Sequence, residues 1–202
     1  MSLHAQPIAR DVAAALLAGL ALSGNAWAEQ PLPRFAPCMD SDIARFERAL
    51  TRKPASPRPD VFDIGSASGV DVCGTAGIML CDLSDAPQPC QHRLASEQEA
   101  WRSAVLDSLP APETVAGQAG EWSDALYPQL HALAHDRSAG PDCAGSDAVM
   151  TAWCEAREAN RRLQPAVLAW QLARYMGAAQ PATDAGWAMA PPPTRPKARK
   201  KH

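Results

Sequence analysis

The amino-acid sequence predicts a mainly α-helical protein: an irregular, disulfide-stapled bundle of about five helices with a disordered, proline-rich, basic C-terminal tail. Three observations indicate this fold class. Apolar residues recur at helical spacing in several segments. Prolines separate these segments, and no pair of segments has the alternation of a β-hairpin. Six cysteines, an even number, all lie beyond residue 28.

Residues 1–28 have the layout of a secretory signal peptide. Arg10 precedes an apolar run from Val12 to Leu22, and small residues then lead to Ala26-Trp27-Ala28, an Ala-x-Ala cleavage pattern. The run is about 11 residues long, whereas a bilayer span needs roughly 20. We therefore predict cleavage near Ala28 and a periplasmic or secreted protein that does not span a membrane.

The chain beyond the signal divides into a body and a tail. Residues 29–177 suit a single α-helical, disulfide-containing domain of ordinary size. Residues 178–202 are rich in proline and alanine and carry five basic residues against Asp184, while the whole chain has a net charge of −3. The body is therefore acidic and the tail basic, so the two parts should prefer different partners.

The first expected helix begins at Asp40 or Ser41, either of which can cap it, and ends near Thr51. Prolines then interrupt the chain. Residues 61–79 are rich in glycine and serine, which predicts a loop with a short strand at 61–64.

Two further helices follow this loop. Ser96 and Glu99 have the spacing of a capping box, and apolar residues recur at helical spacing until Pro110 ends the run. The next helix spans Trp122 to His135, with Pro128 predicting a kink or a fresh start.

The last two expected helices are separated by a proline. Ser146 and Asp147 open one helix that runs to about Leu163. Pro165 can occupy the first position of the other, and Gly177 ends it.

Tryptophans are spread over the expected helices and the tail. Aromatic residues at helical positions usually belong to the core, and a carbohydrate-stacking platform would need some of them exposed. Trp187 differs because it lies in the tail, where nothing obvious would bury it. The tryptophans on expected helices are Trp101, Trp122, Trp153 and Trp170.

The cysteines predict three structural disulfides. Six cysteines allow 15 connectivities, and the sequence does not choose between them. The alternative is a metal or redox site, but the chain lacks the Cys-x-x-Cys spacing that such sites favour. The residues concerned are Cys38, Cys73, Cys81, Cys90, Cys143 and Cys154.

Candidate catalytic and metal sites are few. His131 and His135 lie four apart on an expected helix and can share one face, where Asp136 or Asp142 would complete a metal site. The residues between the histidines are Ala-Leu-Ala, so the glutamate of the His-Glu-x-x-His pattern is absent. Neither a nucleophile elbow nor a glycine-rich phosphate loop is present in the sequence. We therefore favour a protein without cofactors and without enzymatic activity.

The end of the tail is a stiff proline spacer followed by a basic cluster. Such a segment is expected to stay disordered and can contact anionic surfaces. Specific nucleic-acid binding is not expected, because the body is acidic and has no basic stripe. The basic residues concerned are Arg195, Lys197, Arg199, Lys200 and Lys201.

Residues 143–163 resemble the end of the LprI-type periplasmic domains, a family described as lysozyme inhibitors. There too a cysteine pair precedes a helix that ends in Arg-Leu, here Arg162-Leu163. The N-terminal cysteine pair of that family has no clear counterpart, because Cys73 and Cys81 are too close together. The resemblance implies a periplasmic inhibitor.

These observations favour an exported, non-enzymatic binding or structural protein associated with the cell envelope. Its expected partner is an envelope protein or a cell-wall component. The first alternative is an inhibitor of a secreted cationic enzyme such as lysozyme, attracted by the acidic body. The second, less favoured alternative is a metal-dependent hydrolase that uses His131 and His135.

Overall fold

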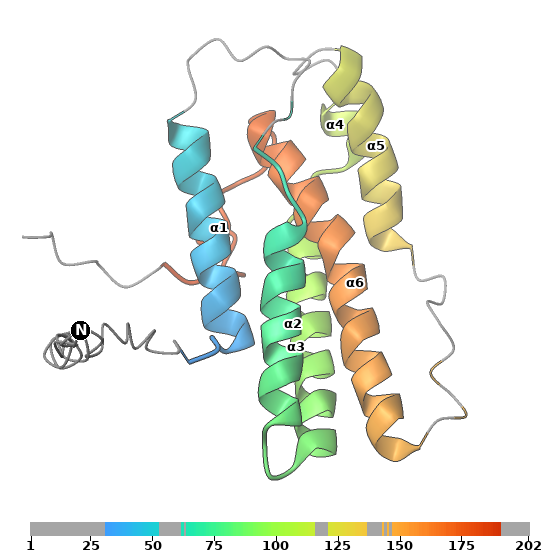
Figure 1. The fold of residues 1–202 in the computed structure, drawn as a ribbon. Coiled ribbons are helices and arrows are strands. Elements are labelled where there is room, and N and C mark those ends of the chain that lie inside the picture. Colours follow the sequence, from blue (N-terminus) through green and yellow to red (C-terminus); the bar gives the residue numbers. More distant parts are fainter. Residues whose placement is uncertain are drawn as a thin grey trace, which may run out of the picture. The chain divides into compact units, whose positions relative to one another are not determined.

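The computed structural model describes residues 31–52, 62, 64–115, 121–136, 143, 145 and 147–190. The chain divides into two compact units, residues 1–31 and 32–202, and the helices belong to the second. None of the described residues lies in a β-strand, so the predicted all-α class is confirmed. The described part of the chain forms six helices: α1 (Phe35–Thr51), α2 (Ser68–Asp82), α3 (Pro87–Asp107), α4 (Pro112–Val115), α5 (Glu121–His135) and α6 (Ala148–Tyr175) (Figure 1).

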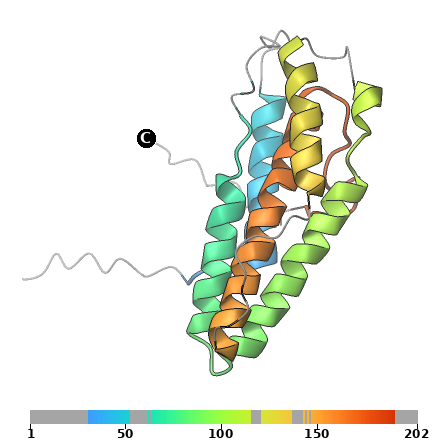
Figure 2. The ribbon, with the colours of Figure 1, turned by 90° about the vertical axis from the view of Figure 1, so that its right-hand side faces the viewer.

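The longest helix, α6, organises the bundle. It packs against α2, α3 and α5, and Figure 2 shows it lying between α2 and α3. Its side chains Leu163, Val167 and Trp170 are fully buried. α1 packs against α2, and the short α4 packs against α5. No helix in the described part of the chain combines the length and apolar character that a bilayer crossing requires.

Helix α1 begins earlier than the sequence predicted. It starts at Phe35 rather than at Asp40 or Ser41, and its end at Thr51 is as expected. Pro37 is tolerated because the first turn of a helix leaves its backbone N–H groups without intrahelical partners. The added turn buries Phe35.

Helix α2 replaces a segment that was expected to be a loop, and that prediction was wrong. Its glycines allow neighbouring helices to approach its backbone closely: Gly69 faces Asp42 of α1, Gly74 faces Asn160 of α6, and Gly77 faces Leu94 of α3. Glycine is a weak helix former, but close packing outweighs that preference. Of the strand expected at 61–64, residues 62 and 64 are described and lie in no strand.

Replacing Gly74 by alanine is expected to destabilise the fold. A Cβ there would overlap the buried amide of Asn160, and this overpacking should outweigh the better helix preference of alanine. We expect a net loss of roughly 1–2 kcal/mol in the free energy of unfolding, measured by urea denaturation. The matched control is Gly77→Ala, whose Cβ would lie 3.0 Å from a Leu94 methyl group that can shift. Equal losses in the two variants would contradict this account of α2.

Helix α3 also begins earlier than predicted. It starts at Pro87, and the expected capping box lies inside it. Ser96 does not cap the helix: its hydroxyl donates to the carbonyl of His92 at 3.0 Å. Proline suits the first helical position because its φ angle is already helical and its missing N–H costs no bond there. The helix ends at Asp107, before Pro110 as expected.

Helix α6 is one continuous helix where two were predicted. Asp147 caps it as expected, accepting hydrogen bonds from the backbone N–H groups of Val149 and Met150. Pro165 lies inside the helix instead of opening a new one. A proline there removes a backbone hydrogen bond, but buried residues on both sides of it pack into the same core. Gly177 ends the helix with a positive φ of 77°, which a glycine adopts without strain.

Residues 178–190 are not the disordered segment that the sequence predicted. Trp187 is buried, with its ring centroid 4.7 Å from that of Trp170 and 5.8 Å from that of Trp101. Ala182 is also buried. The backbone N–H of Met189 donates to Asp40 at 2.8 Å. The packed domain therefore extends past residue 177, while the basic tail 191–202 lies outside the described residues.

The other tryptophans differ in exposure. Trp170 is fully buried, as expected for a core residue, whereas Trp101 and Trp153 are half-buried. Trp122 was expected in the core but is exposed on α5. The prediction that the four tryptophans on expected helices lie in the core was therefore wrong for Trp122.

Candidate functional site

Three disulfides staple the helices, as predicted. Cys38–Cys73 joins α1 to α2, Cys81–Cys90 joins α2 to α3, and Cys143–Cys154 joins α6 to the segment before it. All six cysteines are paired, so none offers a thiolate to a metal or a substrate. Full pairing is the arrangement expected of cysteines that stabilise a fold.

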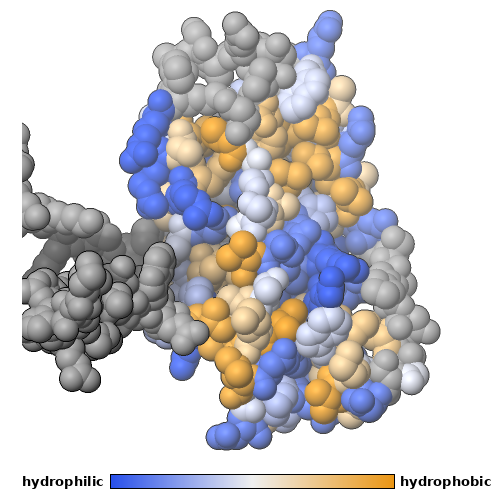
Figure 3. Space-filling model, viewed as in Figure 1, coloured by the Kyte–Doolittle hydropathy of each residue, from blue (hydrophilic) through white to orange (hydrophobic). Residues whose placement is uncertain are grey.

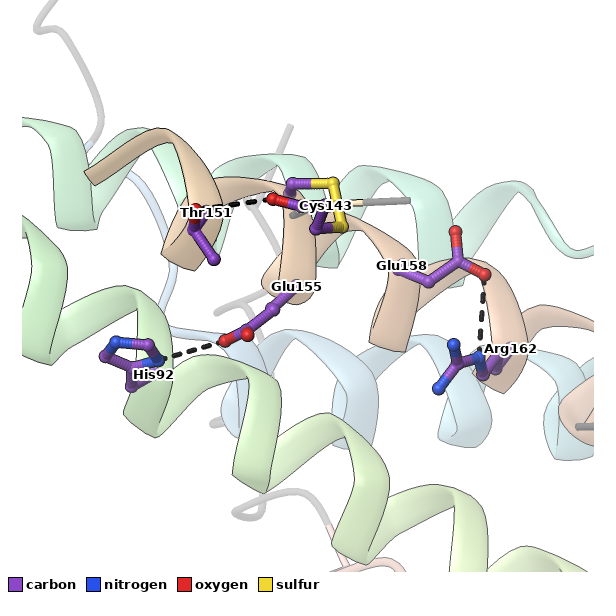
Figure 4. The surroundings of a disulfide bond; sticks show 7 residues. His92, Cys143, Thr151, Glu155, Glu158 and Arg162 are labelled. Carbon is purple, nitrogen blue, oxygen red and sulfur yellow. Dashed lines mark hydrogen bonds and ion pairs between the residues drawn. A yellow bond between two sulfur atoms is a disulfide. The ribbon is translucent and has the colours of Figure 1, made fainter. Parts of the chain in front are cut away.

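The Cys143–Cys154 disulfide lies where α6 begins, next to contacts that hold this helix in place (Figure 4). Thr151 donates to the carbonyl of Cys143 at 3.3 Å. Glu155 reaches across to His92 of α3, with 3.1 Å between the carboxylate oxygen and Nδ1. These contacts position the first half of α6 relative to α3.

A buried arginine fastens α5 to α3. Arg102 of α3 donates to the carbonyls of Ala134 and Asp136 at 2.8 and 3.3 Å. These carbonyls belong to the C-terminal end of α5, where intrahelical donors run out. The arginine also pairs with Glu99 at 3.8 Å. This charged cluster therefore has a structural role.

His131 and His135 lie together on α5, as their spacing predicted. Their rings stack with 4.2 Å between centroids, and the Nδ1 of His135 bonds to the backbone carbonyl of His131 at 2.9 Å. Within the described ranges, no group of three His, Cys, Asp or Glu residues is placed to hold a metal ion. Asp142, one expected third ligand, lies outside those ranges. The pair alone gives no support to the hydrolase alternative.

The stability of the protein is expected to fall in mild acid through His131. Burial lowers the pKa of this histidine below its ordinary value of 6.5, the nearby His135 lowers it further, and Glu113 opposes both. The folded state therefore binds the proton less readily than the unfolded chain. Full stability is expected above pH 6.5, with a decline as the pH falls below that value.

Urea midpoints measured between about pH 5 and 7.5 test this pH dependence. His131→Gln should flatten the profile. His135→Gln removes the secondary cause but keeps the burial, so it should retain part of the slope. An unchanged slope in His131→Gln would contradict the assignment.

An apolar hollow lies among α1, α2, α3 and the residues before α1. Its volume is about 510 Å³, and its walls include Leu32, Phe35 and Leu94. Glu97 at its edge has a pKa raised by burial. None of the residues that line this hollow has a buried polar atom without a hydrogen-bond partner, so we do not assign it a function.

A second hollow, here called the polar groove, runs between α2 and α6 and has a volume of about 450 Å³. Figure 3 shows hydrophilic surface over the middle of α6, beside α2. The residues that line the polar groove are spaced three or four positions apart along each helix. They therefore lie on the sides of α2 and α6 that face each other. They are Asp71, Thr75 and Ile78 of α2 and Trp153, Arg157, Asn160, Arg161 and Gln164 of α6.

Two arginines give the polar groove its positive charge. The guanidinium of Arg157 lies over the ring of Trp153, 5.2 Å from the ring centroid. Among the described residues, neither Arg157 nor Arg161 forms a hydrogen bond or an ion pair, in contrast to Arg162, which pairs with Glu158 at 3.5 Å. The two guanidinium groups are therefore available to an anion.

Asn160 adds a buried acceptor to the same groove. Its side chain is 5% exposed, and its amide lies against Gly74 of α2. Its Oδ1 has no hydrogen-bond donor in the described part of the protein. A buried acceptor left unmatched costs about 1–3 kcal/mol. The oxygen is almost fully covered, so a ligand donor reaches it only if a neighbouring side chain of the groove moves aside.

The opposite wall of the polar groove carries a carboxylate. Asp71 accepts a hydrogen bond from Gln164 across the groove, at 3.4 Å. Thr75 follows one turn later on α2 and adds a hydroxyl group. The groove therefore combines two cations with oxygen acceptors on its other side.

The sequence did not predict this groove. The spacing of Arg157 and Arg161 was visible, but their partners across the groove lie on a helix that was expected to be a loop. The predicted anionic-surface residues of the basic tail lie outside the described residues.

No protein-family model, curated protein or solved structure matches this chain. The resemblance of residues 143–163 to LprI-type domains therefore stays a likeness over one short segment.

Proposed function

We propose that this protein is an exported, non-enzymatic binding module of the cell envelope, and that its binding site is the polar groove. The observation that carries the proposal is the set of unmatched polar groups there: Arg157, Arg161 and the buried oxygen of Asn160. Arg157 and Arg161 are exposed and have no partner within the described residues, so they are free to meet an anion, while the buried, unmatched oxygen of Asn160 is costly for folding alone. This combination favours a role in binding.

The side chains of the groove favour binding over acid–base catalysis. Arginine stays protonated in proteins, and the asparagine amide does not titrate, so neither exchanges protons near neutral pH. Asp71 is the one carboxylate in the groove lining. The disulfides support a rigid scaffold, which lowers the entropic cost of binding.

Export and oxidation are tested on protein isolated from its native compartment. Alkylation under denaturing conditions is expected to label no cysteine before reduction and all six after it. N-terminal sequencing is expected to begin near Glu29, directly after the predicted cleavage site. Six reactive thiols, or an intact N-terminus, would contradict the proposal.

Binding in the groove is tested by NMR of the tryptophan indole groups. Trp153 lines the groove, whereas Trp122 is exposed on α5. Adding the low-molecular-mass fraction of a cell-envelope extract is expected to shift the indole N–H signal of Trp153 and leave that of Trp122 in place. An unmoved Trp153 signal at high extract concentration would count against this site.

Inhibition of a cationic enzyme such as lysozyme is a second proposal, supported by the acidic body and by the likeness of residues 143–163. The polar groove does not favour it, because the guanidinium groups of Arg157 and Arg161 would repel a cationic partner. A cell-wall clearance assay with lysozyme tests it. Unchanged clearance at high excess of this protein would reject inhibition.

A further inference from the structure

We infer that the polar groove binds a small carboxylate that also carries hydrogen-bond donors next to its charge, such as a sugar acid, a hydroxy acid or an amino acid. The inference rests on the proposed function, because it assigns a ligand class to the same groove. Three features of the groove lead to it: the arginine pair, the oxygen acceptors beside and opposite that pair, and the volume.

The arginine pair selects an anion. Arg157 and Arg161 are four apart on α6, so their guanidinium groups lie one turn apart on the same side of the helix. The ring of Trp153 supports Arg157, which reduces the freedom that this side chain loses on binding. A planar guanidinium binds a carboxylate through two parallel hydrogen bonds.

The acceptors select a ligand that donates hydrogen bonds. Asp71 is exposed and faces α6 from the other wall, and the oxygen of Asn160 lies without a donor beneath the groove, where a ligand reaches it by displacing a neighbouring side chain. Hydroxyl or ammonium groups would satisfy both oxygens, whereas a bare anion would satisfy neither. The negative charge of Asp71 also disfavours a dianion such as phosphate.

The size of the groove fits a small ligand. Its volume of about 450 Å³ lies within the range of small-molecule sites. Helix α2 is tied to α1 by Cys38–Cys73, and α6 packs against both α2 and α3. Both walls of the groove therefore belong to the packed bundle before a ligand arrives.

Calorimetric titration of the full-length, oxidised protein tests the ligand class with five probes. D-glucuronate carries hydroxyl donors and L-alanine an ammonium donor, while acetate has the carboxylate alone. Glucose is the neutral control and inorganic phosphate the dianion control. We expect D-glucuronate or L-alanine to bind at least about tenfold more tightly than acetate, glucose and phosphate, the gain expected of one charge-assisted hydrogen bond. Tighter binding of D-glucuronate would show that the groove prefers hydroxyl donors, and tighter binding of L-alanine that it prefers an ammonium donor.

Variants locate the binding in the groove. The double variant Arg157→Gln, Arg161→Gln is expected to weaken the preferred probe by at least about tenfold. The double variant Arg48→Gln, Arg52→Gln, which removes the same two charges from exposed positions at the end of α1, should leave the affinity unchanged. Equal losses in the two would mean that net charge, not the groove, attracts the ligand, and would overturn the inference.

Asn160→Leu separates a ligand-binding role from a packing role. Leucine has a similar size and no unmatched oxygen, so thermal stability should stay level or rise. Affinity for the preferred probe should nevertheless fall at least about fivefold. If the variant is stable and binds as the wild type does, the acceptor role of Asn160 is wrong.

The remaining outcomes are also decisive. Phosphate or acetate binding as tightly as D-glucuronate and L-alanine would overturn the ligand class, and so would the absence of binding by every probe. Neither result affects the outcome of the oxidation and export tests, which examine the proposed function separately. Conversely, free thiols in native protein would refute that function whatever the probes do.

Discussion

Replacing Trp187 by alanine is expected to lower the free energy of unfolding by about 3–5 kcal/mol, a large share of the stability of a typical domain. The ring packs edge-on against Trp170 and Trp101, and it is 7% exposed. Its removal would leave a cavity between two other large rings, which cannot collapse without moving α3 and α6. The indole nitrogen has no acceptor among the described residues, which places the expected loss toward the lower end.

Urea denaturation of the two proteins measures this loss, and Trp122→Ala is the matched control. Trp122 is 43% exposed, so the same truncation there should cost less than about 1 kcal/mol. A Trp187→Ala variant no less stable than Trp122→Ala would show that residues 178–190 contribute nothing to the core.

Removing the Cys38–Cys73 disulfide is the second large effect. The double variant Cys38→Ala, Cys73→Ala is expected to lose about 4 kcal/mol, because the bridge closes a loop of 35 residues and so restricts the unfolded chain most. The other two bridges close loops of 9 and 11 residues, for which the same relation gives about 2.5–3 kcal/mol each.

The test is whether the stability lost on removing each disulfide increases with the length of the loop that the disulfide closes. Each cysteine pair is replaced by alanine in turn, and the free energies of unfolding are compared under oxidising conditions. The alanine pair Cys81→Ala, Cys90→Ala serves as the control, since it removes the same chemical groups from a shorter loop. A smaller loss for Cys38–Cys73 than for this control would contradict the loop-length account.

Local signals in the sequence predicted the parts of the fold that depend on local chemistry. Asp147 caps α6, and α5 lies where the apolar pattern and its flanking residues placed it. Gly177 ends α6 because a glycine adopts the positive φ that this turn requires. In each case the interaction that decides the structure joins residues only a few positions apart in the sequence.

The errors occurred where distant parts of the chain decide the local structure. The glycines of α2 indicated a loop, but Gly69, Gly74 and Gly77 are places where other helices approach its backbone. Pro165 indicated a helix boundary, but burial on both sides keeps α6 continuous. Packing energy from many contacts outweighs a local preference of one or a few kcal/mol.

The all-α class, the even set of cysteines that form disulfides, and the two ends of α6 could be read from the chain alone, because each follows from its own periodicity or from the chemistry of neighbouring residues. Only the tertiary structure decided which cysteines pair, where Trp187 lies, and that Arg157, Arg161 and Asn160 face Asp71 across a groove. These features join residues far apart in the chain, and their geometry exists only once the helices have packed.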